Sequence, residues 1–370
     1  MRVALIHDYL VQYGGAERVL EIFTEMYPDA DIYTLIHDES KLYGGFRDKK
    51  IHTSFIQKLP FAKTNHRLFP LLMPSAIESF DLSKYDLILS STNSYSKGVI
   101  TSPDSIHISY CHTPMRYTWD DCHRYFKEFK YSRLIKFLLP FAITYIRMWD
   151  KISSDRPDYY IANSYNVQRR ISKYYRLESK VIYPPVLTDK FKVLDNPKNN
   201  FYLMLGRFLP YKHYDIVIQA FVKNKKRLII VGSGPEEEKL IALAKNCKNI
   251  EFKGRLDDDK ARDLFMNCKA FIFPSEDDFG IVPVEAMSAG RPVIAFGKGG
   301  ALETMIDGKT GVLFYKQTRK SFQIALDKFE KMKFDSSFIR KHSEKFSVER
   351  FKRELKEFID EKVGEKNNII

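Results

Sequence analysis

Residues 273–289 form the segment best suited to chemistry, because an acidic loop there separates an expected strand from an expected helix. The loop carries Glu276 and Asp277, and carboxylates accept hydrogen bonds from sugar hydroxyls. Phe279-Gly280 makes a turn at which backbone can approach a ligand closely. The helix that follows offers unpaired N–H groups and a positive dipole end, which suit a phosphate. The segment indicates a ligand with both hydroxyls and phosphate, and the plainer interpretation is that its acids only cap the helix.

A second segment places two cations after the strand expected at 202–205. Gly206 and Arg207 end that strand, and Lys212 follows five residues after the arginine. Arginine offers a bidentate fork and lysine a point charge, so the pair could stabilise a departing diphosphate. Alone, two surface cations mean little in so basic a chain. Combined with the acidic loop, they indicate transfer from a phosphorylated donor.

Two features of the first half could also line a site. Gly14 and Gly15 follow the first expected strand and open a helix, although the third glycine of the dinucleotide fingerprint is missing. His112 comes directly after the strand expected at 106–111, where a side chain can face a ligand. A tight turn and a purely structural histidine are the plainer interpretations.

The elements that must position these residues follow an α/β pattern. Short apolar runs alternate with helical segments in both halves, which predicts two parallel sheets with helices on both faces. Pro184-Pro185 interrupts the pattern, so we expect domains at 1–185 and 186–345 and a helical tail at 346–370 that packs on the first domain. Ligands of such folds bind at the carboxyl ends of the strands.

The composition limits the partners and the compartment. The chain has 370 residues, a formal net charge of +13 and four cysteines without metal or redox spacing. These features favour a reducing cytoplasm and anionic partners. The stretch 134–149 is too interrupted to span a bilayer, but the basic and aromatic region 124–156 around it could lie on an anionic membrane surface. An amphipathic helix packed on its own domain is the alternative.

Together these motifs resemble those of the family 4 glycosyltransferases of the GT-B fold. The family carries two carboxylates eight positions apart around a Phe-Gly turn, here Asp277 and Glu285, together with Gly-Arg and a lysine five residues later. The resemblance implies two doubly wound Rossmann-like domains facing a central cleft, with a C-terminal helix crossing back to the first. It assigns Glu285 to the donor ribose. The first carboxylate is normally glutamate, so either Asp277 or Glu276 could face the sugar.

The resemblance extends to a reaction and its site. It implies retaining transfer without a metal or another cofactor, with His112, Arg207, Lys212, Asp277 and Glu276 as catalytic candidates. Donor contacts are implied at Gly14, Gly15, Gly206, Arg207, Lys212, Gly232, Gly254, Phe279, Gly280, Ile281, Val282 and Glu285. Asp257-Asp258-Asp259 resembles a metal-binding motif, but it precedes a helix and is interpreted as a cap.

The region 109–120 and the Phe279 turn are most similar to the bacterial O-antigen mannosyltransferase branch. That similarity implies GDP-mannose as the donor and a lipid-linked oligosaccharide as the acceptor. From the cysteines and the basic region, we expect a cytoplasmic protein that could lie on the inner face of the cell membrane. A UDP-sugar donor and a GT-B sugar-nucleotide epimerase are alternatives, and product analysis without acceptor separates the epimerase. A non-catalytic assembly subunit would not need Arg207, Lys212 and Glu285 together. No recognition motif supports nucleic-acid binding.

Overall fold

The computed structural model describes residues 1–41, 45, 46, 48–120, 122, 133–198 and 200–367. Part of the basic region expected on a membrane, residues 123–132, lies outside the described residues. The chain forms two compact units. The first comprises Met1–Tyr183 with Lys352–Ile370, and the second comprises Pro184–Phe351. The division falls two residues before the boundary expected at 185.

The first unit is built on a parallel sheet with the strand order β3-β2-β1-β4-β5-β6-β7. This is a doubly wound order, in which the direction of strand addition reverses between β1 and β4. The strands are β1 (Val3–Leu10), β2 (Asp31–His37), β3 (Ile51–Thr53), β4 (Leu87–Thr92), β5 (Ile106–Cys111), β6 (Tyr159–Ala162) and β7 (Lys180–Val181).

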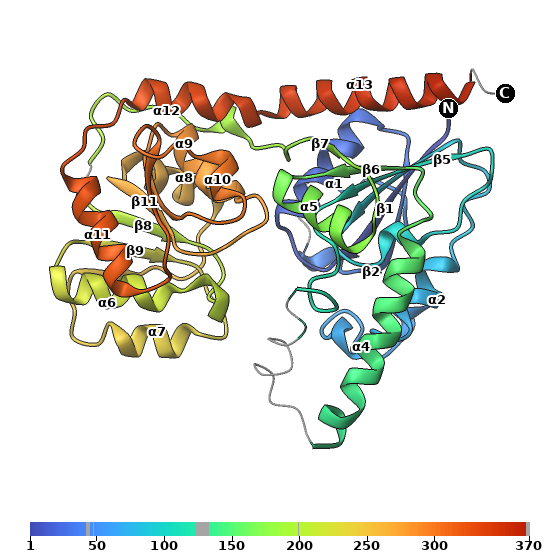
Figure 1. Cartoon of the computed structure of the whole chain (residues 1–370), viewed down its shortest axis with the longest axis horizontal. Helices are drawn as coiled ribbons and strands as arrows, with labels where there is room; N and C mark the ends of the chain where they lie inside the picture. The colour runs from blue at the N-terminus through green and yellow to red at the C-terminus, as the bar shows by residue number, and fades with distance from the viewer. Residues whose placement is uncertain (42–44, 47, 121, 123–132, 199, 368–370) are drawn as a thin grey trace. The chain divides into compact units, whose positions relative to one another are not determined.

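Helices cover both faces of this sheet (Figure 1). They are α1 (Gly15–Met26), α2 (Met73–Glu78), α4 (Arg133–Ser153) and α5 (Tyr165–Tyr174), with 3₁₀ turns η1 (Glu39–Lys41), η2 (Phe55–Lys58), η3 (His66–Leu68) and η4 (Ser96–Gly98). Phe23 of α1 packs edge to face on Tyr110 of β5, whereas Trp149 of α4 joins the apolar cluster that contains Ile88 of β4. Ser164 caps α5, as the sequence predicts, by accepting from the Val167 N–H.

The second unit repeats the plan with the strand order β10-β9-β8-β11-β12-β13, all parallel. Its strands are β8 (Tyr202–Leu205), β9 (Leu228–Val231), β10 (Ile250–Phe252), β11 (Ala270–Phe273), β12 (Val293–Phe296) and β13 (Gly311–Phe314). Here the order reverses between β8 and β11, the two strands that carry the Gly-Arg segment and the acidic loop. The fold therefore brings those two segments to one point of the sheet edge.

The helices of the second unit lie on either side of this sheet (Figure 1). They are α6 (Tyr214–Asn224), α7 (Glu237–Leu243), α8 (Asp258–Asn267), α9 (Ile281–Ser288), α10 (Ala301–Thr304), α11 (Arg319–Glu330) and α12 (Ser336–Ser343), with 3₁₀ turns η5 (Thr188–Lys190), η6 (Pro210–Lys212) and η7 (Glu344–Phe346). Asp257 accepts a hydrogen bond from the Lys260 N–H at the start of α8. The interpretation of the aspartate run as a helix cap is confirmed.

The last helix, α13 (Val348–Asn367), begins in the second unit and continues in the first. From Lys352 onward its side chains contact the first unit. Lys352 lies 2.6 Å from the Glu25 carboxylate, and Phe358 packs edge to face on Tyr159. The expected tail at 346–370 thus corresponds to one long helix rather than a separate body.

Three strands were not expected from the sequence: β3, β7 and β13. Each has two to four residues, and β3 and β7 lie at the sheet's edges. The first strand also extends past its expected end at His7 to Leu10. Its polar residues His7 and Asp8 are buried there because each has hydrogen-bonding partners at the carboxyl edge of the sheet.

Candidate functional site

In the second unit, glycines end three neighbouring strands and allow their loops to pack closely. Gly206, Gly232 and Gly254 follow β8, β9 and β10, and all have positive φ. A Cβ on Gly232 would lie 1.9 Å from the Gly206 carbonyl oxygen, whereas a Cβ on Gly254 would meet no atom within 4 Å. The Gly232 N–H donates to the Gly254 carbonyl over 2.7 Å. This edge is therefore shaped by backbone, and a ligand there would meet peptide groups first.

The Gly-Arg segment and the acidic loop meet in an ion pair. Lys212, in η6 after β8, places Nζ 2.8 and 2.6 Å from the two carboxylate oxygens of Asp277, after β11. Both side chains are partly buried. The Lys212 ammonium also lies 5.5 Å from the centre of the Phe273 ring. Arg207 is exposed on the same loop. The structure thus joins two catalytic candidates that are 65 residues apart in sequence.

Glu276 is held more loosely than Asp277. Its carboxylate lies 3.6 Å from the exposed ammonium of Lys298, and its own side chain is 36% exposed. The Asp277 backbone is fixed from the other side, since its carbonyl accepts from the Gly300 N–H over 2.9 Å. A Cβ on Gly299 would lie 2.4 Å from that carbonyl oxygen, so the loop depends on the absence of a side chain there. The Asp277 carboxylate is therefore held more firmly in place than the neighbouring Glu276 carboxylate.

The acidic loop leads into α9 through Gly280, the N-cap, whose φ of +87° is readily adopted by glycine. No acidic residue lies in the first turn of α9, where Ile281 and Val282 contribute backbone N–H groups. The Phe279 side chain is buried and packs edge to face on Phe346. Donor contact from Phe279 would therefore come from its backbone. Glu285 lies one turn into the helix and is 7% exposed.

In the first unit, Gly14 and Gly15 open α1 after a short loop that follows β1. The Gly14 N–H donates to the Glu17 carboxylate over 2.8 Å, so the glycine turn is closed by the first turn of its own helix. His112 follows β5 and is 8% exposed. Its Nε2 lies 2.8 Å from Ser91 Oγ at the end of β4. Burial lowers the pKa of His112 to about 3, so the ring is neutral at physiological pH.

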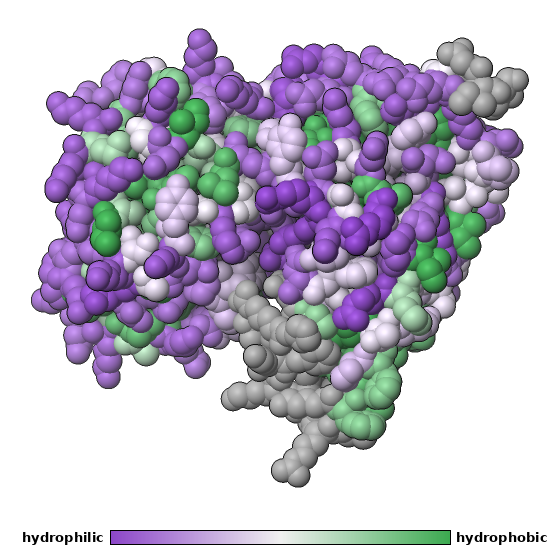
Figure 2. Space-filling model, viewed as in Figure 1, coloured by the Kyte–Doolittle hydropathy of each residue, from purple (hydrophilic) through white to green (hydrophobic). Residues whose placement is uncertain are grey.

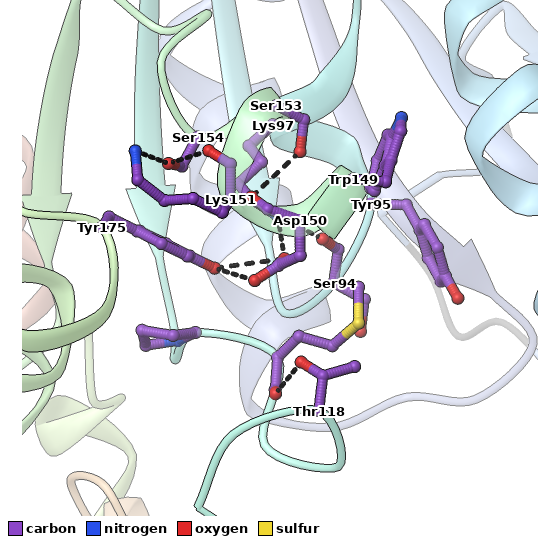
Figure 3. A network of polar contacts seen from close by, with 12 residues as sticks. Ser94, Tyr95, Lys97, Thr118, Trp149, Asp150, Lys151, Ser153, Ser154 and Tyr175 are labelled. Atoms are coloured by element: carbon purple, nitrogen blue, oxygen red, sulfur yellow. Dashed lines mark hydrogen bonds and ion pairs between the residues drawn. The ribbon is translucent and has the colours of Figure 1, made fainter. Parts of the chain in front are cut away.

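A buried polar network missed by the sequence analysis holds the same sheet edge. The Asp8 carboxylate accepts four backbone N–H groups over 2.6–2.8 Å, from Asn93, Ser94, Tyr95 and Ser96. Below this loop Lys97 pairs with Asp150 of α4 at 2.5 Å, and Tyr175 points its hydroxyl at the same carboxylate (Figure 3). Lys97 and Asp150 are 1% and 0% exposed. The loop after β4 is thus anchored by one buried anion on each side.

Metal binding finds no support in side-chain clusters of the described ranges, where no group of three or more His, Cys, Asp or Glu residues could hold an ion. Transfer without a metal nevertheless stays a prediction.

Comparison with known proteins agrees with this geometry. Residues 186–352 match the family model described as glycosyl transferases group 1. Alpha-1,3/1,6-mannosyltransferase ALG2 of Dictyostelium discoideum is 24% identical, and the match covers 89% of each chain. O-antigen chain mannosyltransferase C of Escherichia coli is 28% identical over 45% of this chain and 47% of its own. For this and several other relatives, the chain spans about half of the relative's length.

The fold is shared across nearly the whole chain. The crystal structure of Anabaena Alr3699/HepE in complex with UDP superposes with a TM-score of 0.70 at 18% sequence identity, covering 98% of this chain and 100% of that one. At this identity the likeness shows the fold alone. The chain therefore has the two-unit α/β GT-B fold and resembles GT-B glycosyltransferases, bacterial O-antigen mannosyltransferases among them, and its second unit matches the group 1 glycosyl transferases.

Proposed function

We propose that the chain is a retaining glycosyltransferase that moves mannose from GDP-mannose to a lipid-linked oligosaccharide. The observation that carries the proposal is the Lys212–Asp277 pair. It places a cation and a carboxylate together where the strand order of the second unit reverses, just before the N-terminus of α9. A nucleotide sugar needs both groups, because its diphosphate is anionic and its sugar is a polyol. The names of the mannosyltransferase relatives support mannose as the transferred sugar.

The reaction assigns a role to each contact. The bond between the anomeric carbon and the diphosphate oxygen breaks, the acceptor oxygen bonds to the same face of that carbon, and the acceptor proton passes to the departing diphosphate. Arg207, Lys212 and the first N–H groups of α9 stabilise the negative charge that grows on the leaving group. Glu285 accepts hydrogen bonds from the ribose. No metal is required in this scheme, since cations and N–H groups of the chain supply the positive charge.

The ion pair also suggests how the donor enters. Before binding, Lys212 and Asp277 neutralise each other at 2.6 Å. A diphosphate competes with Asp277 for the ammonium, and the carboxylate released by this exchange can accept hydrogen bonds from the sugar. Glu276 pairs with the exposed Lys298, 3.6 Å away, so binding of a diphosphate to Lys212 does not release it. The contacts therefore favour Asp277 over Glu276 as the sugar-facing carboxylate.

Donor identity is tested by thermal shift with GDP, UDP and ADP sugars, since a ligand that binds the folded state raises its melting temperature. We expect the largest shift with GDP-mannose. A larger shift with a UDP sugar would overturn the mannose assignment and leave the transferase proposal standing. No shift and no transfer with any nucleotide sugar would overturn both.

Site roles are tested by substitution. Lys212→Ala removes one stabiliser of the leaving group, and we expect kcat to fall roughly 10²-fold. Lys260→Ala is the matched control, because Lys260 also pairs with an aspartate, at 2.8 Å, but on the exposed end of α8. Asp277→Asn should reduce transfer far more than Glu276→Gln. The reverse order would assign the sugar contact to Glu276.

An anionic membrane surface is the partner that α4 supports. This helix buries Ile143, Ile146 and Trp149 in the first unit but exposes a second apolar face, comprising Phe137, Leu138, Phe141, Tyr145, Met148 and Ile152. Figure 2 shows pale apolar residues along α4 beside the hydrophilic surface of the unit. Phe137 and Phe141 are 68% and 67% exposed. In the part of the chain the structure describes, no helix is long and apolar enough to cross a bilayer.

The spacing of this apolar face, at every third or fourth residue, is that of a helix lying in a membrane interface. A second set of exposed apolar side chains lies on the segment that packs beside α4, at Phe55, Phe61, Leu68, Leu71 and Leu72. The net charge of +13 adds attraction to anionic lipid. A lipid-linked acceptor resides at such a surface, so the two partner proposals support each other.

Vesicle co-sedimentation tests the membrane proposal. Each phenylalanine contributes about 1.5–3 kcal/mol when fully buried, so Phe137→Glu with Phe141→Glu should weaken binding to anionic vesicles at least ~10-fold. Ile324→Glu is the control, because Ile324 is exposed on α11 of the second unit. Equal binding by the double variant and the control would contradict the proposal.

A further inference from the structure

The turn between η2 and η3 holds a phenylalanine in an unusual backbone conformation. Phe61 has a φ of +64°, which is a rare value for a bulky side chain and costs free energy. Its carbonyl oxygen accepts a hydrogen bond from the Asn65 N–H over 2.7 Å and another from the Thr64 N–H over 3.2 Å. These two bonds close the turn, so the left-handed conformation is built into the local structure.

The same residue leaves its ring in water. Phe61 is 71% exposed, more than any other large apolar side chain in the part of the chain that the structure describes. The turn below it is anchored, because Ile56 and Ala62 are 0% and 1% exposed and belong to the apolar cluster of the first unit. The exposed ring forgoes the stabilisation that burial would provide. Two unfavourable features, positive φ and exposure, therefore coincide at one residue of a well-anchored turn.

The surroundings of the ring are basic. Lys58 and Lys63 lie on either side of Phe61 in the sequence, and both are exposed. Between Asp48 and Glu78 the sequence contains no acidic residue. Ammonium groups attract the phosphates of anionic lipids, whereas an aromatic ring partitions into the layer beneath them. A ring between two cations therefore fits the surface of an anionic bilayer.

We propose that Phe61 inserts into an anionic bilayer while Lys58 and Lys63 contact the lipid phosphates. The inference rests on the membrane partner of the proposed function and deepens it, because it assigns insertion to one residue and headgroup contact to two. Glycine or asparagine would adopt this turn with less strain, so the phenylalanine is explained by its ring rather than by the fold. The closed turn also fixes the ring in advance, which lowers the ordering cost of binding.

Phe61→Gly removes the ring and relieves the backbone at the same time, so it separates a membrane role from a folding role. We expect the affinity for vesicles of phosphatidylglycerol and phosphatidylcholine to fall about tenfold, since one largely exposed phenylalanine no longer leaves water. The melting temperature should stay the same or rise, because glycine adopts positive φ readily. A lower melting temperature with unchanged vesicle binding would overturn the proposal, since Phe61 would then serve only the fold.

Phe61→Trp keeps an aromatic ring and reports its position. It should bind vesicles as tightly as the wild-type chain, and its added fluorescence should be quenched by lipids with brominated acyl chains. The wild-type chain gives the baseline, since Trp119 and Trp149 are its two tryptophans. Added fluorescence that brominated lipids do not quench would place the ring outside the bilayer and refute the insertion.

The two lysines are tested against a control of equal charge. Lys58→Gln with Lys63→Gln should weaken binding to the same vesicles by about fivefold for each cation near the surface. Lys245→Gln with Lys248→Gln removes the same charge from exposed positions of the second unit and should have little effect. Equal losses in the two double variants would mean that only net charge matters, and would overturn the assignment of headgroup contact to Lys58 and Lys63.

Comparison with the α4 variant separates this inference from the proposal that it extends. Wild-type binding by Phe61→Gly, together with a loss in Phe137→Glu with Phe141→Glu, would leave α4 as the membrane contact and overturn the role of the turn. No binding by the wild-type chain would overturn both. A wild-type chain that dimerises without lipid, while Phe61→Gly stays monomeric, would assign the ring to a second copy of the chain instead. A chain that inserts Phe61 but transfers no sugar would leave the inference standing and refute the transferase proposal.

Discussion

Asp150→Asn is the substitution whose cost can be worked out most completely from the structure. The Asp150 carboxylate accepts from Lys97 at 2.5 Å, from Trp119 Nε1 at 2.7 Å and from the Tyr175 hydroxyl at 3.0 Å. The substitution keeps the shape but leaves Lys97 as a buried cation without a counter-charge, because the new amide oxygen and the Ser94 carbonyl, 2.7 Å away, are both neutral acceptors. Removing one partner of a buried pair costs about 3–5 kcal/mol, so we expect a loss of that size.

A double-mutant cycle isolates the ion pair itself. Lys97→Met should cost about as much as Asp150→Asn, because it leaves the opposite charge buried. The double variant has no charge left, and its remaining cost is the weaker pairing of the Trp119 and Tyr175 donors with one neutral amide group, at about 1–3 kcal/mol. The two substitutions should therefore be strongly non-additive, by at least ~3 kcal/mol. The exposed pair of Lys352 and Glu25 supplies the control, since Lys352→Met should cost less than about 1 kcal/mol.

Urea unfolding monitored by tryptophan fluorescence measures these losses. The sequence has two tryptophans, Trp119 and Trp149, and both lie in the first unit, so the signal reports the unit that holds the pair. The reasoning would be refuted by a single-variant loss below about 1 kcal/mol, or by a double variant whose loss equals the sum of the two singles.

Two further predictions concern pH and backbone space. Burial lowers the pKa of His107 and His112 to about 3, so both rings take up protons only in the unfolded chain as pH falls below about 6.5, and stability should decline from there toward pH 3 by up to ~2.7 kcal/mol per pH unit. Urea midpoints across that range check this, and His107→Gln should halve the slope. Gly300→Ala places a Cβ 2.1 Å from the Phe279 carbonyl oxygen and should abolish the thermal shift by donor, whereas Gly364→Ala, with no atom within 4 Å, should stabilise α13 by about 0.5–1 kcal/mol.

The fold was predictable where apolar runs are long enough to indicate strands. Both doubly wound sheets and most ends of the expected helices agree with the sequence pattern, because each of those helices comes after a strand in the chain and several helices begin at a capping side chain. β13 was missed because it starts at Gly311, a residue that favours turns over strands. That glycine is required by packing, since a Cβ there would lie 1.8 Å from the Val293 carbonyl oxygen. Such a contact depends on strand pairing, which a single sequence does not reveal.

Some residues of the candidate site were also predictable from the sequence, whereas others were not. The acidic loop and Lys212 were expected together because motifs that follow neighbouring strands share one sheet edge. The buried contacts that join His7 to Ser91 and Ser91 to His112 were not expected, since His7 and Ser91 lie 84 residues apart and neither belongs to a motif. The usable signal was a histidine and an aspartate at the end of an otherwise apolar strand. Polar residues in such a position must be buried with partners or face a ligand, and here they are buried.

The aspartate that replaces the usual glutamate in the acidic loop now has a physical context. Gly299 and Gly300 fix the Asp277 backbone from one side, and Lys212 holds both carboxylate oxygens from the other. Because the Asp277 backbone is already held close to Lys212, the shorter side chain of aspartate is long enough to reach the ammonium. Exchange of Lys212 onto a diphosphate would release Asp277 at the moment the sugar arrives, so charge would be neutralised at every stage of binding. In this arrangement the short aspartate side chain is suited to pair with Lys212 before the donor binds and to contact the sugar afterwards.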